Sequence, residues 1–361
     1  MKLAVLSAGA GGASAAVEMT LQGHEVRLWN RAPATLEPFR RAGGVQYTGV
    51  FGAGFVPLAA ITDDLRAAVC DADLILVCLP TLAHAGVAAM LIEAGCAATP
   101  VLLNPGHTGG ALEVGAVFDR AGIAVPPIAE FSTLTYVARK STPHTVSTTG
   151  RAKKVALAAL PGGGPARELA ARLYDCAWPV PDVLATGLRN VNMVLHTPGA
   201  LLGAAWIEAT GGDFTFYVEG LSDGVARVME RLDDERRAVG RAFGHELASL
   251  FDEMSAIGTI EPGADRAAGL AAAIRGGTAN QAIKAPGSLS HRYFLEDFWY
   301  GLKPFLALAD IAGVRAETAS ALMVLCTALL GPLAPGEGRS AAAMGVAGLT
   351  RDQLVAMIRE G

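Results

Sequence analysis

Cysteine is scarce in this sequence, and no two cysteines form a Cys-x-x-Cys pair. The chain has only five, scattered along its length: Cys70, Cys78, Cys96, Cys176 and Cys326. An odd, scattered set argues against a disulfide framework and against a zinc site, and it is typical of buried thiols in a reducing compartment. We therefore expect a cytoplasmic protein without a metal site.

Charge is also scarce, because only 17% of the residues are charged and the net charge is -5. No run of lysine and arginine is present, and nucleic-acid binding needs clustered cations, so we expect no nucleic-acid partner. A hydrophobic content of 52% excludes a disordered chain. At 361 residues, the chain is long enough for two domains, each with its own core.

Two apolar stretches, residues 191–207 and 316–333, are long enough to suggest membrane spans. The first contains polar Asn192 and His196, and the second is bounded by Glu317 and a Gly-Pro break with little basic charge nearby. Both are better explained as buried helices, and we expect no membrane association. Such a helix is buried either in the core of its own domain or in a homodimer.

The first residues have the pattern of a dinucleotide-binding fold, with an apolar strand, a glycine-rich turn and an alanine-rich helix. In such a turn the first glycine allows tight bending, the second lets the backbone approach the pyrophosphate, and the third lets helix and strand pack closely. Serine stands here in place of the first glycine, so the turn has to accommodate a Cβ. The expected cofactor-binding residues of this loop are Ser7, Gly9, Ala10, Gly11 and Gly12.

A secretory signal peptide would have a similar beginning, with a lysine, a short apolar run and small residues. Glycines interrupt the apolar run, however, and residues 24–29 are typical of a second strand of the same βαβ unit. We therefore favour the dinucleotide loop.

The end of that second strand bears on the choice between the two nicotinamide cofactors. An NAD site usually has an acidic residue there for the ribose 2′-hydroxyl, whereas an arginine suits a 2′-phosphate. The chain has Asn30 and Arg31. NADP(H) is therefore favoured over NAD(H), unless Arg31 is simply a solvated loop residue.

Strand and helix patterns alternate along the first half of the chain. Residues 44–58 are typical of a hairpin, Thr62-Asp-Asp caps a helix, and 74–80 and 101–103 read as buried parallel strands with helices at 82–93 and 109–121. This alternation predicts an α/β fold with a Rossmann-type doubly wound sheet over residues 1–182. Residues 183–361 follow helical spacing and predict an all-helical C-terminal domain, whose last helix opens with a capping box at Thr350-Arg-Asp-Gln353.

Loops that follow the carboxyl ends of parallel strands line the cofactor crevice of such folds. Leu79 and Pro80 follow one predicted strand, and Asn104 and Gly106 follow the next. We expect these four residues to meet the nicotinamide half of the cofactor, although a glycine-rich turn is sometimes only a turn.

Two distant segments carry residues suited to acid–base chemistry. In the first, Asn192 and His196 share one face of a buried helix. In the second, Asp297 could orient the imidazole and Arg292 could bind a carboxylate through two hydrogen bonds. Without further evidence, a buried histidine is more often structural, and Arg292 could belong to an ordinary salt-bridged helix start.

The chain resembles the opine dehydrogenases, which reductively join an α-keto acid to the amino group of an amino acid. The resemblance covers nearly the whole chain and rests on the glycine loop, the 104–112 segment Asn-Pro-Gly-His-Thr-Gly-Gly-Ala-Leu, Glu130-Phe-Ser-Thr133, Asn190-Val-Asn-Met-Val-Leu-His196 and Arg292-Tyr-Phe-Leu-Glu-Asp297. It implies that His196 is the catalytic acid and base, that Asp297 is its partner, and that Arg292 anchors the keto acid.

The resemblance also implies an α-keto acid such as pyruvate and an L-amino acid as substrates, with reduction of an imine between them. The residues expected to line the substrate cleft, besides Arg292, are Asn192, Glu130, Thr133 and His107. Recognition of the amino-acid side chain depends on residues such as Trp206, Phe214, Tyr217 and Met254, whose positions the sequence does not fix.

Other reductases share a glycine loop and a helical second domain, among them glycerol-3-phosphate dehydrogenases and ketopantoate reductases. These resemblances imply a catalytic lysine on the second-domain helices, and this chain has no lysine between Lys154 and Lys284. A 2-hydroxyacid reductase and a non-catalytic NADP sensor remain as alternatives. A sensor has no use for an aligned His196 and Asp297. The distance between these two side chains in the folded protein therefore distinguishes a sensor from an enzyme.

Overall fold

The computed structural model describes residues 1–359, which form two compact units. Unit 1 comprises residues 1–106 and 110–186 together with 357–359, and unit 2 comprises residues 107–109 and 187–356. The predicted boundary between residues 182 and 183 lies close to the start of the long segment of unit 2. Residues 107–109 belong to unit 2 although they lie within the sequence of unit 1, and residues 357–359 belong to unit 1 although they follow unit 2; neither assignment was predicted. That the two units act as a cofactor domain and a substrate domain remains a prediction.

Unit 1 is built on an eight-stranded sheet in the order β12-β11-β8-β7-β6-β1-β2-β5. All neighbouring strands are parallel except β11 and β8, which are antiparallel. The strands are β1 (Lys2–Leu6), β2 (Glu25–Trp29), β5 (Ala60–Thr62), β6 (Leu74–Val77), β7 (Val101–Leu103), β8 (Ile128–Phe131), β11 (Val155–Ala159) and β12 (Ala177–Pro179). The predicted strand at 101–103 is confirmed, and the strand predicted at 74–80 is present but ends at Val77; β6 and β7 are both fully buried.

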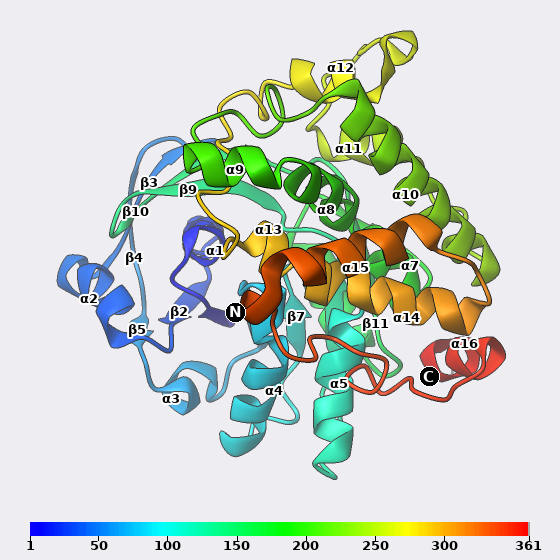
Figure 1. Cartoon of the computed structure of the whole chain (residues 1–361). Helices are drawn as coiled ribbons and strands as arrows, with labels where there is room; N and C mark the ends of the chain where they lie inside the picture. The colour runs from blue at the N-terminus through cyan, green and yellow to red at the C-terminus, as the bar shows by residue number, and fades with distance from the viewer. Residues whose placement is uncertain (360–361) are drawn as a thin grey trace. The chain divides into compact units, whose positions relative to one another are not determined.

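Helices alternate with these strands as a doubly wound α/β fold requires (Figure 1). They are α1 (Ala10–Leu21), α2 (Pro33–Ala42), α3 (Leu65–Val69), α4 (His84–Glu93), α5 (Gly110–Arg120) and α6 (Gly164–Leu173). A second sheet, in the order β4-β3-β10-β9, contains the predicted hairpin as β3 (Gly44–Gly49) and β4 (Gly54–Pro57), with β9 (Tyr136–Thr142) and β10 (Thr145–Arg151). A 2.7 Å hydrogen bond between the Ser14 and Thr148 hydroxyls links α1 to this sheet.

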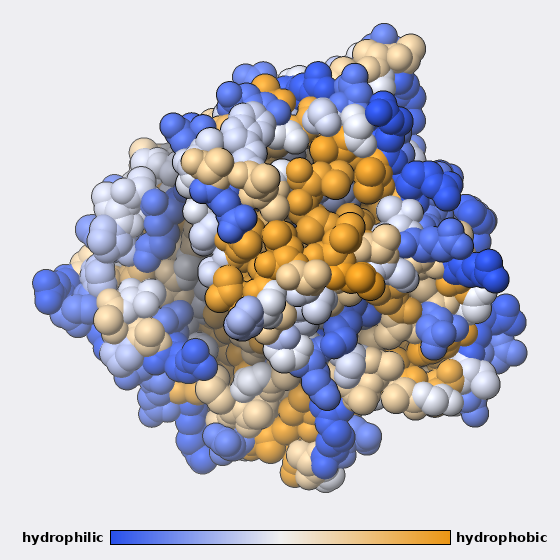
Figure 2. Space-filling view, viewed as in Figure 1, coloured by the Kyte–Doolittle hydropathy of each residue, from blue (hydrophilic) through white to orange (hydrophobic). Residues whose placement is uncertain are grey.

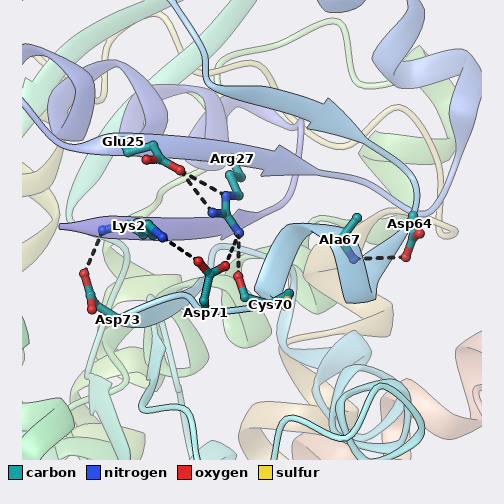
Figure 3. Close-up of polar contacts among 8 residues, drawn as sticks. All are labelled: Lys2, Glu25, Arg27, Asp64, Ala67, Cys70, Asp71 and Asp73. Atoms are coloured by element: carbon teal, nitrogen blue, oxygen red, sulfur yellow. Dashed lines mark hydrogen bonds and ion pairs between the residues drawn. The ribbon is translucent and has the colours of Figure 1, made fainter.

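A surface network of charges lies at the amino ends of β1 and β2 (Figure 3). Arg27 donates to Glu25 at 3.0 Å and to Asp71 at 3.1 Å, and Lys2 also pairs with Asp71. Exposed pairs of this kind contribute at most about 1 kcal/mol each. Because the glycine loop follows the opposite, carboxyl end of β1, this network supports the sheet at the end away from that loop.

Unit 2 is helical. Within residues 187–356 the structure has no β-strand, and an isolated β-bridge joins Thr215 to Lys284. Its helices are α8 (Val191–Leu202), α9 (Ala204–Thr210), α10 (Asp223–Ala242), α11 (Leu250–Ile257), α12 (Gly269–Gly276), α13 (Arg292–Leu295), α14 (Lys303–Ala312) and α15 (Glu317–Leu330). A turn of π-helix, η3 (Phe298–Leu302), joins α13 to α14. None of the helices in residues 1–359 combines the length and the hydropathy needed to cross a bilayer.

The last helix, α16 (Arg351–Arg359), begins with the predicted capping box. The Thr350 backbone N–H donates to the Gln353 side chain at 2.8 Å, and the Gln353 N–H donates to the Thr350 hydroxyl at 3.3 Å. The two bonds satisfy backbone donors that have no partner inside the helix, which fixes where the helix starts.

Candidate active site

The glycine loop of unit 1 has the backbone that a dinucleotide site needs, with a serine in an unusual conformation. Ser7 adopts a φ of 151°, in the region that favours glycine, and its hydroxyl accepts the Gly9 N–H at 3.1 Å. A Cβ added to Gly12 would lie 2.1 Å from the Ser7 carbonyl oxygen, so only glycine fits where α1 meets the loop. Gly9 caps α1 without a side-chain bond, which leaves this end of the helix suited to a phosphate.

We expect Gly12→Ala to lose measurable NADPH binding, because the new methyl group forces the loop away from α1. Gly86→Ala is the matched control, since a Cβ at that helical position meets no atom within 4 Å. The control should keep NADPH affinity and gain up to about 1 kcal/mol of stability from its higher helix propensity. Fluorescence titration with NADPH and thermal melting measure both effects. Normal binding by Gly12→Ala would mean that the cofactor does not use this loop.

The end of β2 lies beside the same loop. The Asn30 side-chain oxygen accepts the Ala8 N–H at 3.3 Å, and the Lys140 ammonium donates to the Ala8 carbonyl at 3.3 Å. Arg31 is exposed. Asp63, which follows β5, pairs with Arg40. Two cations, Arg31 and Lys140, therefore belong to the segments that surround the loop.

The loops after β6 and β7 differ in their use of polar side chains. Leu79 is half-buried and Pro80 is exposed, whereas Asn104 is fully buried. The Asn104 amide donates to the Thr135 hydroxyl at 2.9 Å and accepts the Thr135 N–H at 3.2 Å. Gly106 is bonded through its N–H to the Phe131 carbonyl at 2.9 Å. These contacts fix the loop, and a contact of Asn104 or Gly106 with the cofactor remains a prediction.

Glu130 is also engaged in holding this region. One carboxylate oxygen accepts the Ala111 N–H at 2.9 Å, and the other accepts the Thr186 hydroxyl at 2.5 Å. The residue is fully buried in unit 1. These bonds anchor the carboxylate to α5 and to Thr186, and a place for Glu130 in the substrate cleft remains a prediction. Thr133, the other residue of this segment that was expected there, is half-buried in the turn after β8.

Unit 2 brings together His196 and Asp297, which are 101 residues apart in the sequence. The His196 Nδ1 lies 2.7 Å from a carboxylate oxygen of Asp297, and both side chains are buried. Burial by itself would raise the pKa of Asp297, but the charge and hydrogen bond of His196 and the charge of Arg292 hold that pKa below its usual value. Asp297 is therefore a carboxylate that accepts from Nδ1–H, which fixes the tautomer of the imidazole.

Aromatic side chains complete the surroundings of His196. The hydroxyl of Tyr217 lies 2.7 Å from Nε2, and the Tyr293 ring stacks on the imidazole at 3.7 Å between centroids. Asn190 caps α8 by accepting the Met193 N–H at 3.4 Å, which positions the helix that carries His196. Asn192 is half-buried, and within residues 1–359 no hydrogen bond joins it to His196.

Arg292 is the first residue of α13, and its side chain is 48% exposed. Its Nε lies 2.9 Å from a carboxylate oxygen of buried Glu296, one helical turn later. The salt-bridged helix start that was considered as an alternative is therefore present. The charge of the Arg292 guanidinium also lowers the pKa of Asp297. A guanidinium fixed through Nε can still offer its two terminal nitrogens to a carboxylate.

His107 belongs to the short segment of unit 2 that follows Gly106. It is buried and adopts a φ of 59°, which is uncommon for a residue other than glycine. The next residue holds it there: the Thr108 hydroxyl donates to the Gly187 carbonyl at 3.2 Å and accepts from Asn190 at 3.1 Å. Arg339, fully buried, donates to the Thr108 carbonyl at 2.8 Å. No local pattern identifies Arg339, because its contact with Thr108 spans 231 residues.

Burial lowers the pKa of His107 to about 3, and the neighbouring charge of Arg292 acts in the same direction. The unfolded chain takes up a proton near pH 6.5 and the folded chain does not, so this histidine makes stability fall as the pH drops from about 6.5 towards 3. Between pH 7 and pH 5, the free energy of unfolding should fall for the wild type by about 2 kcal/mol more than for His107→Gln. Urea denaturation at the two pH values measures this difference. Equal losses in the two proteins would contradict a neutral, buried His107.

Within residues 1–359, no group of three histidine, cysteine or acidic side chains is arranged to hold a metal ion, and the five cysteines are free.

Comparison with known proteins places the chain among enzymes with this architecture. Residues 179–330 match the model of the NAD/NADP octopine/nopaline dehydrogenase alpha-helical domain. The opine dehydrogenase of Arthrobacter sp. strain 1C is 31% identical over 349 residues, which is 96% of each chain.

Among solved structures, octopine dehydrogenase in complex with NADH and agmatine matches with a TM-score of 0.77 and 19% identity, over 100% of this chain and 98% of the other. Yersinopine dehydrogenase with NADP+ bound matches with a TM-score of 0.73 and 18% identity, again over 100% and 98%. These two likenesses establish the shared fold, a Rossmann-type unit followed by a helical one. Because the Arthrobacter enzyme is 31% identical over nearly all of both chains, the chain belongs to the opine dehydrogenase family and is an NAD(P)-dependent oxidoreductase that acts on CH–NH bonds.

Proposed function

We propose that this enzyme joins a pyruvate-like α-keto acid to the amino group of an L-amino acid, with His196 as acid and base, Asp297 as its orienting partner and Arg292 as the keto-acid anchor. The observation that carries the proposal is the buried 2.7 Å contact between His196 and Asp297. This contact also disfavours the sensor hypothesis, which needs no such pair.

The chain's own residues account for substrate positioning and proton transfer. Arg292 binds the keto-acid carboxylate, which holds the neighbouring carbonyl carbon near the imidazole. The amine adds to that carbon, and water must leave to form the imine. His196 supplies the proton that lets the hydroxyl depart as water, and Asp297 stabilises the imidazolium that donates it. A reduced nicotinamide bound at the glycine loop would supply the hydride for the imine carbon.

The amino-acid substrate can be identified by incubating the enzyme with NADPH, pyruvate and single L-amino acids, and weighing the products by mass spectrometry. The proposal predicts a secondary amine whose mass equals both substrates minus one oxygen atom. Lactate as the sole reduced product would instead indicate a 2-hydroxyacid reductase.

We further propose that NADP(H) is preferred over NAD(H). Exposed Arg31 follows β2, Lys140 donates to the glycine loop, and Asp63 is paired with Arg40. A guanidinium beside the ribose favours a 2′-phosphate. Arg31→Gln should weaken NADPH binding by about tenfold, the effect of losing one charge-assisted hydrogen bond, and should leave NADH binding unchanged as an internal control. An unchanged NADPH dissociation constant would assign Arg31 to solvent.

We also propose that a second copy of the chain covers an exposed apolar face of unit 2. This face comprises Ala321, Val324, Leu325 and Ala328 of α15, at helical spacing, and Leu202 of α8, and Val324 is 68% exposed. Figure 2 shows it as a continuous hydrophobic patch over these helices, which contact one another. Since the face carries no charged side chain, an identical face can meet it across a two-fold axis without burying an unpaired charge.

Light scattering should give about twice the 37.1 kDa chain mass for the wild type and a single chain for Val324→Asp. Val50→Asp is the matched control, because Val50 is 50% exposed in unit 1 and should leave the dimer intact. A monomeric wild type would contradict the dimer.

We also expect the enzyme in the cytoplasm, where its free cysteines stay reduced.

A further inference from the structure

Both ring nitrogens of His196 are engaged in hydrogen bonds. Nδ1 is bonded to Asp297 and Nε2 to the hydroxyl of Tyr217, each at 2.7 Å. Because Nδ1 carries the proton that faces Asp297, the neutral imidazole offers Nε2 as an acceptor, and the Tyr217 O–H donates to it. The nitrogen that would exchange a proton with substrate is therefore in contact with a phenol.

Tyr217 is held firmly in this position. It lies in the segment between α9 and α10, is 7% exposed, and packs edge-on against Phe216 at 5.0 Å between ring centroids. Burial holds the pKa of Tyr217 well above its usual value, and the neighbouring Tyr293 and Asp297 act in the same direction. The phenol therefore keeps its proton at neutral pH, so it cannot serve as a base by itself.

A hydroxyl that keeps its proton can still transmit one, because it accepts on one side while it donates on the other. The charge of Arg292 acts on the Tyr217 hydroxyl as well as on Asp297. Tyr293 follows Arg292 in α13, and its ring stacks on His196 at 3.7 Å and lies 4.9 Å from the ring of Phe216, the neighbour of Tyr217. A keto acid anchored by Arg292 would therefore bind beside the cluster that holds this hydroxyl. We propose that Tyr217 relays protons between His196 and the substrate, an inference that rests on the proposed opine-forming reaction.

In the direction of synthesis, the relay moves two protons. Protonated His196 gives its Nε2 proton to the Tyr217 oxygen, while Tyr217 gives its own hydroxyl proton to the oxygen of the carbinolamine. The carbon–oxygen bond breaks, water leaves with that bond's electron pair, and the nitrogen lone pair forms the C=N bond. His196 ends neutral, Tyr217 ends as the phenol it was, and Asp297 remains a carboxylate throughout.

Single-turnover oxidation of NADPH, with pyruvate and a reactive amino acid in mixtures of H2O and D2O, tests the relay. Two protons moving together in the wild type should give a curved dependence of rate on deuterium fraction. Tyr217→Phe should oxidise NADPH about tenfold to a hundredfold more slowly, within the range of general acid–base effects, with a linear dependence and an unchanged NADPH dissociation constant. A residue that only supports the fold would not change the curvature.

Tyr136→Phe is the matched control, because it removes another buried hydroxyl bonded at 2.7 Å, to Glu18 in unit 1. It should retain the wild-type rate within about twofold and keep the curved dependence. If Tyr217→Phe does not fold, a linear dependence in the wild type would by itself overturn the relay.

A Tyr217→Phe variant with the wild-type rate and curvature, or with only a raised substrate KM, would also overturn the relay. If the wild type shows amine-dependent oxidation of NADPH and Tyr217→Phe behaves in this way, the relay is contradicted and the proposed function stands. A wild type that oxidises no NADPH when an amine is added contradicts the proposed function first.

Discussion

His196→Asn should lower the turnover number by at least about a hundredfold, the scale of general acid–base catalysis, and should bind NADPH normally. Asparagine retains a polar side chain beside Asp297 but cannot take up and release a proton near neutral pH. The glycine loop predicted to bind the cofactor lies in unit 1 and His196 lies in unit 2, so the variant should change turnover without changing NADPH binding. Steady-state rates and fluorescence titration measure the two effects.

His144→Asn is the matched control for this change, because it makes the same replacement at a half-buried histidine of unit 1. We expect its turnover and its NADPH affinity to equal those of the wild type. Near-normal turnover by His196→Asn would remove His196 from the mechanism, and with it the roles assigned to Asp297 and Tyr217.

Arg292→Gln should raise the KM for pyruvate by about a hundredfold, which corresponds to the loss of about 3 kcal/mol from charge-assisted hydrogen bonds. The NADPH dissociation constant should stay unchanged. Arg292→Lys keeps the charge but loses the fork of donors, so it should recover only part of the affinity.

Loss of Arg292 also removes the ion pair with Glu296, which could disturb α13 by leaving a buried carboxylate with one partner fewer. Glu296→Gln separates the two effects, because it breaks the ion pair and keeps the guanidinium. It should hold the KM for pyruvate within about threefold. If Glu296→Gln and Arg292→Gln raise this KM equally, Arg292 acts through the helix and does not anchor the keto acid.

The fold could be predicted largely from local patterns. Uninterrupted apolar runs identified β6 and β7, and the Thr350 to Gln353 spacing identified the cap of the last helix. These features depend on residues a few positions apart, where the sequence is informative. The exchange of residues 107–109 between units depends on where the chain folds back, and no periodicity encodes it.

The candidate site could be predicted in part, through the motifs shared with the family. His196 and Asp297 were paired through such motifs, and the structure brings them to 2.7 Å. Asn104 was expected to meet the cofactor because it follows a parallel strand, and Glu130 was expected in the substrate cleft from the family resemblance. The structure shows Asn104 bonded to Thr135 and Glu130 bonded to Ala111 and Thr186, and their contacts with ligands remain predictions. Tyr217 was expected to recognise an amino-acid side chain, and its contact with Nε2 comes from an irregular segment that sequence patterns do not place.

The most direct measurement follows the loss of reduced-nicotinamide absorbance with NADPH and pyruvate, with and without each of a set of L-amino acids. The opine dehydrogenase mechanism predicts oxidation that depends on the amine and is absent with pyruvate alone. Equal oxidation without any amine would contradict imine reduction and would indicate a 2-hydroxyacid reductase in its place.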